Sequence, residues 1–364
     1  MLTLPIIHRA VSMNVMSQST TGNQLAVVSQ SGCTVSFFDL DTGLRGDILD
    51  VLPEGHELCF DPARRVVYLA HTYRDGFYLA HSAKAHEITV IDVDTHKIVE
   101  IIDIAPEHGP HGMAIGADGL LYVSVEEGPA GPGALIAVDP ATGHTLARHS
   151  AEAAAPHSMI LTPDHHTAFT TNKQTPFVSK IDLTGVAPLA RIPVTGSEGL
   201  ALSSDGARLF VATPAISIPP DPEVPDTVEV FDTASAEPLH TIAVAHTPVA
   251  VHVTADEKLL VGQWIRGTDP TDFASAGVLT IFDARGYTRI AETEVGRCPI
   301  NIISAPDAAT AYVSNLQSGT VCVVDLRDPR VTRTLEIDLG EKLPPERTLP
   351  NQGAHGVAFI PPTD

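Results

Sequence analysis

Histidine recurs at one place in a repeated pattern of this sequence. The stretches HGPHGMAIGADG, from residue 108, and APHSMILTPDHH, from residue 155, both place a histidine ahead of a short apolar run that ends in a turn. Seven residues before the turn position of successive repeats lie His56, His111, His157, Glu198, Val249, Ile300 and His355. Histidine makes up only 17 of the 364 residues, so four histidines at these aligned positions exceed what composition would give.

Such a set of side chains would suit a transition metal. Neutral imidazoles beside a carboxylate are preferred by iron, copper and zinc, whereas calcium and magnesium prefer oxygen ligands. The expected ligands are His56, His111, His157 and His355, and the expected cofactor is a transition metal ion, with iron or copper favoured and zinc as the alternative. Two other interpretations stay open: a metal-free catalytic or binding role, and histidines that only hydrogen-bond water in a polar channel.

Four further residues are candidates for acid–base chemistry. Glu198 occupies the aligned position of its own repeat, and Glu126 follows the second apolar run of the His111 repeat. Burial raises the pKa of a carboxyl group toward neutrality, which would suit either residue to act as a general base. His108 and His246 each lie three residues before an aligned position, where they could support the ligands or form an acid–base pair.

The elements that must position these residues are short strands. Each repeat has an apolar run, a turn such as GADG or SSDG, a second run such as LYVSV or AFTTN, a third run that ends in aspartate and a fourth run. The third run occurs as TVSFFDL, EITVIDV, ALIAVDP, VSKIDL, TVEVFDT, VLTIFDA and TVCVVDL. Four antiparallel strands repeated every ~40 to 50 residues are typical of propeller blades. We therefore expect an all-β fold, a seven-bladed β-propeller that forms a single domain over residues 1–364.

Inner strands of a propeller line its central channel, so aligned side chains of successive blades can converge there. The C-terminal segment HGVAFIPP is expected to be the innermost strand of the first blade, which pairs the N- and C-terminal segments and protects sheet edges. The alternative for that place is VSMNVMSQ, near the N-terminus.

Long loops after the second strand would open on the same face as the histidines and wall a pocket. They span residues 71–86, 214–226 and 263–277, and their aromatic, cationic and apolar groups suit a small organic ligand. Arg74 and Arg266 are expected to grip a carboxylate or phosphate, the alternative being that they pair with the many acidic side chains. The expected substrate-binding residues are His71, Tyr73, Arg74, Tyr78, His81, Asn172, Lys173, Trp264 and Arg266.

One segment carries a family resemblance. AYVSNLQSGTVCVVDLRDPRVTRTLEI resembles the YVTN-repeat propellers, in which tyrosine-valine-x-asparagine, a short loop and valine-x-valine-aspartate follow one another, and the resemblance covers most of the chain. The wider group includes lactonase-like and nitrous-oxide-reductase-like propellers. The resemblance therefore implies the fold and leaves the activity to be argued from the site.

Composition excludes several classes of partner. A net charge of -22 would repel a phosphate backbone, so no nucleic acid partner is expected. No segment approaches the ~18 apolar residues of a membrane span, and the N-terminus lacks a signal-peptide pattern, so we expect no membrane partner and a cytoplasmic location. The four cysteines are too widely spaced to indicate a disulfide framework or a CxxC zinc site. The chain could be a monomer or a homo-oligomer.

The function expected from these features is that of a metal-dependent enzyme acting on a small organic substrate at the top-face mouth of the channel. An oxidoreductase is narrowly favoured, because iron-dependent oxygenases with propeller folds have a similar set of four histidines, although their repeats do not match. A lactonase-like hydrolase or lyase is the alternative, since a metal that lowers the pKa of bound water would also open a lactone. A noncatalytic propeller that binds a ligand or a protein stays open as well.

Overall fold

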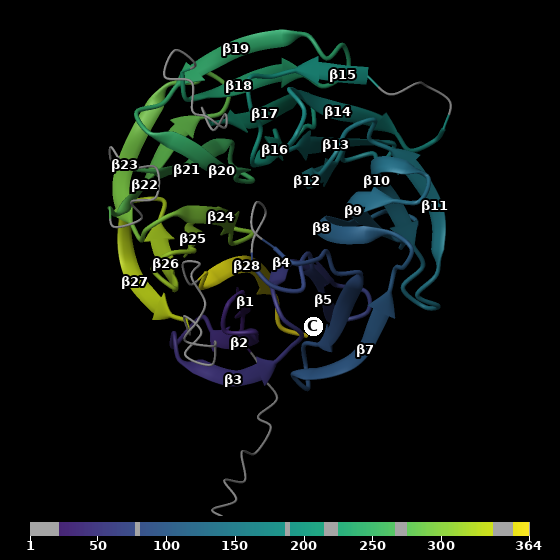
Figure 1. Cartoon of the computed structure of the whole chain (residues 1–364). Helices are drawn as coiled ribbons and strands as arrows, with labels where there is room; N and C mark the ends of the chain where they lie inside the picture. Colours follow the sequence, from purple (N-terminus) through teal and green to yellow (C-terminus); the bar gives the residue numbers. More distant parts are fainter. Residues whose placement is uncertain are drawn as a thin grey trace, which may run out of the picture.

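The structure is a computed structural model, which describes residues 22–76, 81–185, 190–214, 225–265, 275–337 and 352–363. Its strands form seven sheets of four, arranged as blades around a central axis (Figure 1). The described residues form strands, turns and loops and no helix. The predicted all-β, seven-bladed propeller is therefore confirmed. No helix in the described part of the chain is long and apolar enough to span a bilayer.

Each blade is an antiparallel sheet of four strands, numbered below from the innermost strand to the outermost. The first three blades are β28 (Ala354–Ile360), β1 (Gln24–Ser29), β2 (Thr34–Asp39) and β3 (Arg45–Asp50); β4 (Gly55–Asp61), β5 (Val66–His71), β6 (Glu87–Asp92) and β7 (Lys97–Asp103); and β8 (His108–Ile115), β9 (Leu121–Gly128), β10 (Gly131–Val138) and β11 (Thr145–Ser150). Blades 4 and 5 are β12 (Pro156–Leu161), β13 (Thr167–Asn172), β14 (Phe177–Asp182) and β15 (Ala190–Pro193); and β16 (Leu200–Leu202), β17 (Arg208–Thr213), β18 (Thr227–Asp232) and β19 (Pro238–Ala243). Blades 6 and 7 are β20 (Thr247–Val253), β21 (Lys258–Trp264), β22 (Gly277–Asp283) and β23 (Arg289–Val295); and β24 (Pro299–Ser304), β25 (Thr310–Asn315), β26 (Thr320–Asp325) and β27 (Arg330–Glu336).

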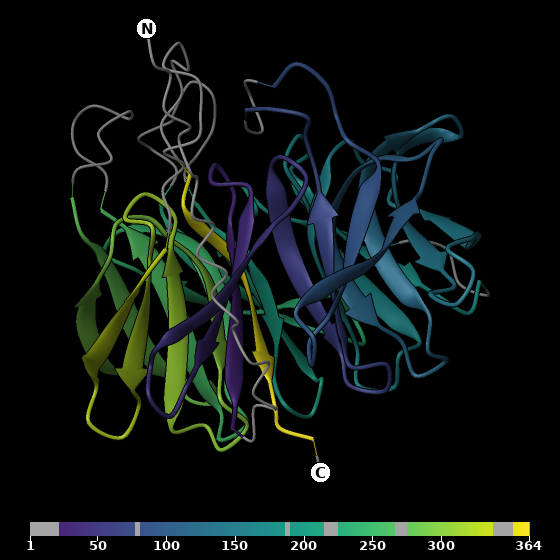
Figure 2. The same ribbon diagram turned by 90° about the horizontal axis from the view of Figure 1, so that it is seen from below.

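The two ends of the ring meet in blade 1. Strand β28 pairs with β1 in antiparallel register, with Gln24 opposite Ile360 and Val27 opposite Val357. Figure 2 shows β28 running beside β1 through the depth of the ring. The expectation that the C-terminal strand completes the first blade is confirmed, and the competing segment at residues 11–18 lies outside the described residues.

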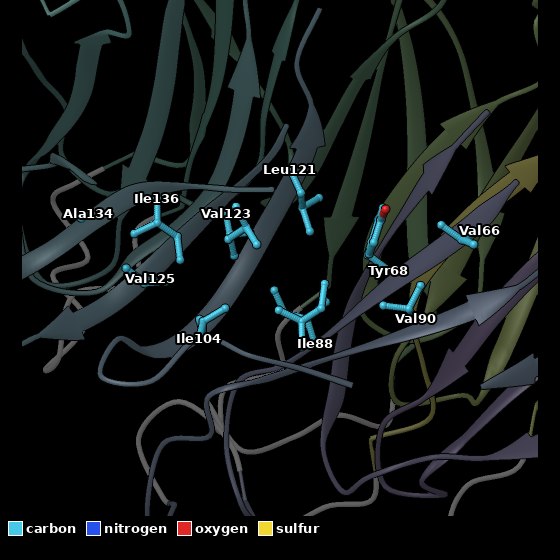
Figure 3. Close-up of a cluster of buried hydrophobic side chains, with 12 residues drawn as sticks. Val66, Tyr68, Ile88, Val90, Ile104, Leu121, Val123, Val125, Ala134 and Ile136 are labelled. Atoms are coloured by element: carbon cyan, nitrogen blue, oxygen red, sulfur yellow. The ribbon is translucent and has the colours of Figure 1, made fainter. Parts of the chain in front are cut away.

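Apolar side chains of adjacent blades form the core. Between blades 2 and 3, Tyr68 and Ile88 pack against Leu121, Val123 and further residues of β9 and β10 (Figure 3). Burying one such side chain contributes roughly 1.5–3 kcal/mol, and every blade boundary repeats the contact. The β-branched residues of the second and third runs therefore fix the packing of the blades, which in turn places the inner strands around the axis.

The aspartate that ends the third strand of each repeat serves the turn that follows. Asp39 Oδ1 accepts a hydrogen bond of 2.7 Å from the Thr42 N–H, and Asp92 Oδ1 accepts the same bond from the Thr95 N–H. The hydrogen bonds from Thr42 lower the pKa of Asp39. The most regular marker of the repeat is thus a structural feature of an exposed turn and lies away from the axis.

Candidate functional site

The four aligned histidines lie side by side on four neighbouring inner strands. His355 is on β28, His56 on β4, His111 on β8 and His157 on β12. Their ring centroids are 4.0 Å apart for His355 and His56, 4.3 Å for His56 and His111, and 3.6 Å for His111 and His157. One nitrogen from each of His56, His111 and His157 lies within 4.8 Å of the others. The structure therefore brings the four predicted ligands together, while metal binding itself stays a prediction.

A β-bulge explains why these side chains leave the ladder. The pairing register shifts between Gly55 and Leu58, and between Pro110 and Met113. It shifts in the same way at His157 and at His355, so each histidine and the residue after it are unpaired. A bulge increases local twist and re-aims a side chain, which here directs the imidazoles together at the start of the strand.

Glycine after two of the histidines permits the close approach of the strands. A Cβ atom at Gly112 would lie 2.7 Å from Met159 N, and one at Gly356 would lie 2.5 Å from His56 O. Interiors are packed too tightly to accept such contacts without a shift of the backbone. The His-Gly pairs are therefore a second signal of the site in the sequence, beyond the histidines themselves.

The imidazoles are buried and neutral. His111 is completely buried, and His56 and His355 are only 7% and 5% exposed. Burial, followed by the neighbouring imidazoles, lowers the pKa of His56 and His111 well below 6.5, and burial lowers the pKa of His355 to about 3. Neutral imidazole is the form that binds metal ions.

Several of their nitrogens lack a partner. No described residue makes a hydrogen bond to Nδ1 of His56, to either ring nitrogen of His111 or to Nδ1 of His355. A buried polar atom left in this state costs about 1–3 kcal/mol. Each neutral imidazole has a lone pair on one nitrogen and a hydrogen on the other, so a ligand that accepts the lone pairs would remove part of that cost.

An ion pair closes one end of the histidine row. Glu198, just before β16, is buried and accepts a hydrogen bond from Nζ of Lys173. Its Oε1 lies 3.9 Å from Nε2 of His157. The Lys173 ammonium thus compensates the charge of the Glu198 carboxylate, and the role of Glu198 as a general base stays a prediction. Lys173 was expected to bind substrate, which stays a prediction; in the structure it binds Glu198.

Glu57 is an acidic residue that was not among the expected site residues. It follows His56 in the bulge, and its Oε2 accepts a hydrogen bond of 2.7 Å from Nδ2 of Asn301, on β24. Its Oε1 lies 3.5 Å from Nδ1 of His355. Although 20% of the side chain is exposed, loss of bulk water raises the pKa of Glu57 to about 8. The sequence offered one signal for this residue. Glu57 directly follows an aligned site position, where three other blades have glycine: Gly112, Gly199 and Gly356.

A cavity of about 220 Å³ extends along the channel from the histidine row. His157, His355, Glu57 and Glu198 line one end of it, and apolar side chains such as Met159 line its wall. Its described lining includes no arginine or lysine, so a substrate carboxylate or phosphate would find no cationic side chain there.

A second group of polar residues lies beside the row. The Tyr73 hydroxyl donates a hydrogen bond of 2.8 Å to the buried carboxylate of Glu126, and Lys84 Nζ lies 3.2 Å from the same side chain. The ring of Tyr73 meets His56 edge-on with centroids 6.1 Å apart, and His81 stacks on Tyr73 at 4.3 Å. Glu126 is therefore linked to the histidine row through Tyr73.

Glu126 and His108 also line a separate, more open cavity of about 660 Å³, together with Lys84 and Gln174. His108 begins β8, and its ring centroid lies 5.7 Å from that of His86. The two predicted acid–base residues thus share a cavity, but they do not line the channel cavity next to the histidines.

Three expected substrate-binding residues have partners within the protein, and substrate binding by them stays a prediction. Both ring nitrogens of His71 are used, by the carbonyl of Pro53 at 3.0 Å and by Thr89 Oγ1 at 2.8 Å. Asn172 Nδ2 donates to the carbonyl of Phe177 at 2.8 Å, which closes the hairpin loop of blade 4. For Arg74 the ion-pair alternative holds, because it binds Glu87 with Nη2 and Oε1 2.6 Å apart.

The remaining expected residues lie elsewhere. Trp264 is buried at the end of β21, and the N–H of His246 donates to Gln263 Oε1 at 3.0 Å just before β20. Neither is among the described residues that line the channel cavity. Tyr78 and Arg266 lie outside the described residues.

Comparisons with known proteins support the fold and little beyond it. The family model described as strictosidine synthase-like, N-terminal, matches residues 97–129, a small part of the chain that includes His108, His111 and Glu126. No curated protein matches this chain.

Two solved structures share the architecture. A functionally unknown protein from Desulfotomaculum acetoxidans is 13% identical, with a TM-score of 0.66 over 94% of this chain and 100% of that one. The dihydro-heme d1 dehydrogenase NirN, in complex with DHE, is 14% identical, with a TM-score of 0.60 over 95% of this chain and 76% of that one. These likenesses agree with the resemblance to a propeller superfamily, and at such identities they carry the fold alone.

Proposed function

We propose that this propeller is a metal-dependent enzyme that acts on a small organic molecule in the central channel. The observation that carries the proposal is the convergence of buried ring nitrogens of His56, His111 and His157 within 4.8 Å, with His355 next in the row. These residues belong to four different blades, so no local feature of the chain forces them together.

The donor set fits a transition metal ion. Metal–imidazole bonds of about 2.0–2.1 Å place two nitrogens of one ion at most about 4.2 Å apart, so small ring rotations would close the present spread. The rings are neutral, as coordination requires, and several of their nitrogens have no hydrogen-bond partner among the described residues. Nitrogen-rich sites of this kind suit iron, copper or zinc.

Oxidation–reduction is the reaction class we favour, because iron and copper both match the ligands and exchange electrons. This choice rests on the ligand chemistry and not on the fold shared with a dehydrogenase. A hydrolase or lyase is the second candidate. It is favoured by the position of Glu57, whose carboxyl group lines the same cavity beside His355 and could transfer a proton to or from a bound molecule.

The size of the cavity limits the substrate. A cavity of about 150 Å³ is enough to hold benzene. The channel cavity, at about 220 Å³, would hold one substituted ring or a molecule of similar size.

Metal analysis of protein made without a histidine tag tests the proposal. We expect close to one iron or copper ion per chain in the wild type, and loss of that metal in the double variant His56→Ala/His111→Ala. The matched control is His252→Gln, since His252 is a channel-lining histidine outside the cluster, with Nε2 2.9 Å from Ser304 Oγ. This control should keep its metal.

The proposal fails if the wild type contains no transition metal and added iron, copper or zinc produces no thermal shift. The second candidate would be favoured if zinc-loaded protein hydrolyses the lactone dihydrocoumarin and the iron- or copper-loaded protein shows no redox activity.

A further inference from the structure

We propose that the hydroxyl groups of Ser124, Thr171 and Ser314 are positioning groups, which lock the inner strands so that the site residues of neighbouring blades meet. The inference rests on the proposed function, because it assigns these hydroxyls a role in setting the metal site. None of the three touches the histidine rings, and each acts through a main-chain carbonyl.

The three hydroxyls make the same contact across three blade boundaries. Each lies on the second strand of one blade and donates to the carbonyl of the site residue in the next blade. Ser124 Oγ donates to the carbonyl of His157 at 2.6 Å, and Ser314 Oγ donates to that of His355 at 2.7 Å. Thr171 Oγ1 donates to the carbonyl of Glu198 at 2.8 Å.

Two of these hydroxyls also stabilise the bulges. A bulge leaves N–H groups without a ladder partner. Ser124 Oγ accepts the Gly112 N–H at 2.9 Å, and Thr171 Oγ1 accepts the Ser158 N–H at 3.1 Å. One hydroxyl therefore joins the bulge of its own blade to the site residue of the next. For Ser124 this links the residue after His111 to His157, the pair whose rings are closest.

The distribution of these hydroxyls follows the site residues around the ring. The positions equivalent to Ser124 in blades 5 and 6 are Ala212 and Gly262, and the inner strands that follow them carry Val249 and Ile300. Thus the hydroxyl is missing where the next site position is apolar.

Blades 1 and 2 do not follow this pattern, because the position equivalent to Ser124 lacks a hydroxyl although the next inner strands carry His56 and His111. In blade 2 the equivalent residue is Ala70, and Thr72, two positions later, donates to the carbonyl of Pro110, next to His111, at 2.7 Å. In blade 1 it is Val28, where a Cβ on Gly55 would lie 3.3 Å from Cγ1 of Val28. His56 therefore has no such hydrogen bond from the preceding blade among the described residues, whereas its neighbours in the row do.

Titration with Cu²⁺, followed by its visible and electron paramagnetic resonance spectra, tests the role. Groups that hydrogen-bond to a metal-binding imidazole typically change metal affinity 10- to 100-fold. Ser124 bonds to the main chain of His157 and not to its ring, so we expect an effect at the lower end of this range. We expect Ser124→Ala to weaken Cu²⁺ binding about tenfold and to change the spectrum. Ser124→Thr should restore both, because Thr171 makes the same contacts from an equivalent position.

The matched control is Ser179→Ala. Ser179 Oγ also donates across a blade boundary, to the carbonyl of Ala151 at 2.7 Å, but away from the inner strands. It should lose similar stability and keep wild-type affinity and spectra. If Ser124→Ala does not fold, Ser314→Ala tests the positioning role in its place, because it removes the hydrogen bond to the carbonyl of His355.

The outcomes separate the two proposals. If the wild type binds Cu²⁺ and the Ser124→Ala and Ser314→Ala variants bind it equally well, or if Ser179→Ala weakens binding as much as they do, the positioning role is overturned and the metal site stands. A wild type that binds no Cu²⁺ and holds no other metal overturns the proposed function, and the positioning role with it.

Discussion

The inner ring has two arcs that share a backbone and differ in side chains. The polar arc consists of His355, His56, His111, His157 and Glu198, and the apolar arc consists of Val249 and Ile300. In the histidine blades two residues leave the ladder at the bulge, whereas in blades 6 and 7 only one does. Blades 6 and 7 form complete four-stranded sheets, so the fold needs neither the histidines nor the wider bulge. The side chains of the polar arc are therefore not required for a blade to form.

The largest loss of stability is expected when a residue type of the apolar arc is introduced into the polar arc. Blade 6 carries Ala250 at the position where blade 3 carries Gly112. Gly112→Ala should lower the free energy of unfolding by about 3 kcal/mol, because its Cβ would lie 2.7 Å from Met159 N and the strands must separate. Denaturant unfolding measures this change.

Gly46→Ala is the control for this prediction, since a Cβ there lies 3.5 Å from its nearest neighbour, Phe37 O, on an outer strand. It should change stability by no more than about 0.5 kcal/mol. Equal losses in the two variants would mean that close approach is not special to the polar arc.

An intermediate effect, on the pH dependence of stability, is expected for His71. This residue is a buried histidine outside the row, and its ring nitrogens already have partners in the protein. Burial lowers the pKa of His71 to about 4, from an ordinary value of 6.5. As pH falls, the unfolded chain takes up this proton first, so the stabilisation is complete above pH 6.5 and is lost between pH 6.5 and 4. Between pH 7.5 and 5 the loss should be about 2 kcal/mol.

His71→Gln should be less stable at neutral pH, because it loses contacts to Pro53 and Thr89, and should show about 2 kcal/mol less pH dependence over the same range. Unfolding curves at the two pH values give both quantities. An unchanged pH dependence would contradict a neutral, buried His71.

The smallest effect concerns the apolar arc itself. Val249→Ala removes two buried methyl groups and should cost about 1 kcal/mol. Metal content and Cu²⁺ affinity should stay within about twofold of the wild type, since no ligand or hydroxyl contact is touched. A larger loss of affinity would show that the two arcs are coupled and that the comparison between them is too simple.

Much of the fold was open to prediction because its determinants are local. The aspartate after the third strand has its hydrogen-bond partners within a few residues, as at Asp39 and Thr42. Alternation of apolar residues and the spacing of turns then indicated the number of blades. The strand that closes the ring was also predictable, because HGVAFIPP matches the inner strands of the other repeats.

The site was only partly predictable. Alignment of the repeats identified His56, His111, His157 and His355, since equivalent positions on successive blades must lie at one level. The alignment gave no information on His71 and Asn172, which end β5 and β13: their place before a loop does not reveal that each side chain already has partners inside the blade. Glu57 was missed because its environment depends on Asn301, more than two hundred residues away along the chain.

Closure of the ring by β28 has a consequence for when the site can first exist. His355 stands on that strand, and β28 pairs with β1, at the opposite end of the described chain. During synthesis on a ribosome, six blades can form while one imidazole and the inner edge of blade 1 are still missing. The complete row of four imidazoles can therefore exist only in a chain that has been translated through β28, and a chain that stalls earlier would lack His355.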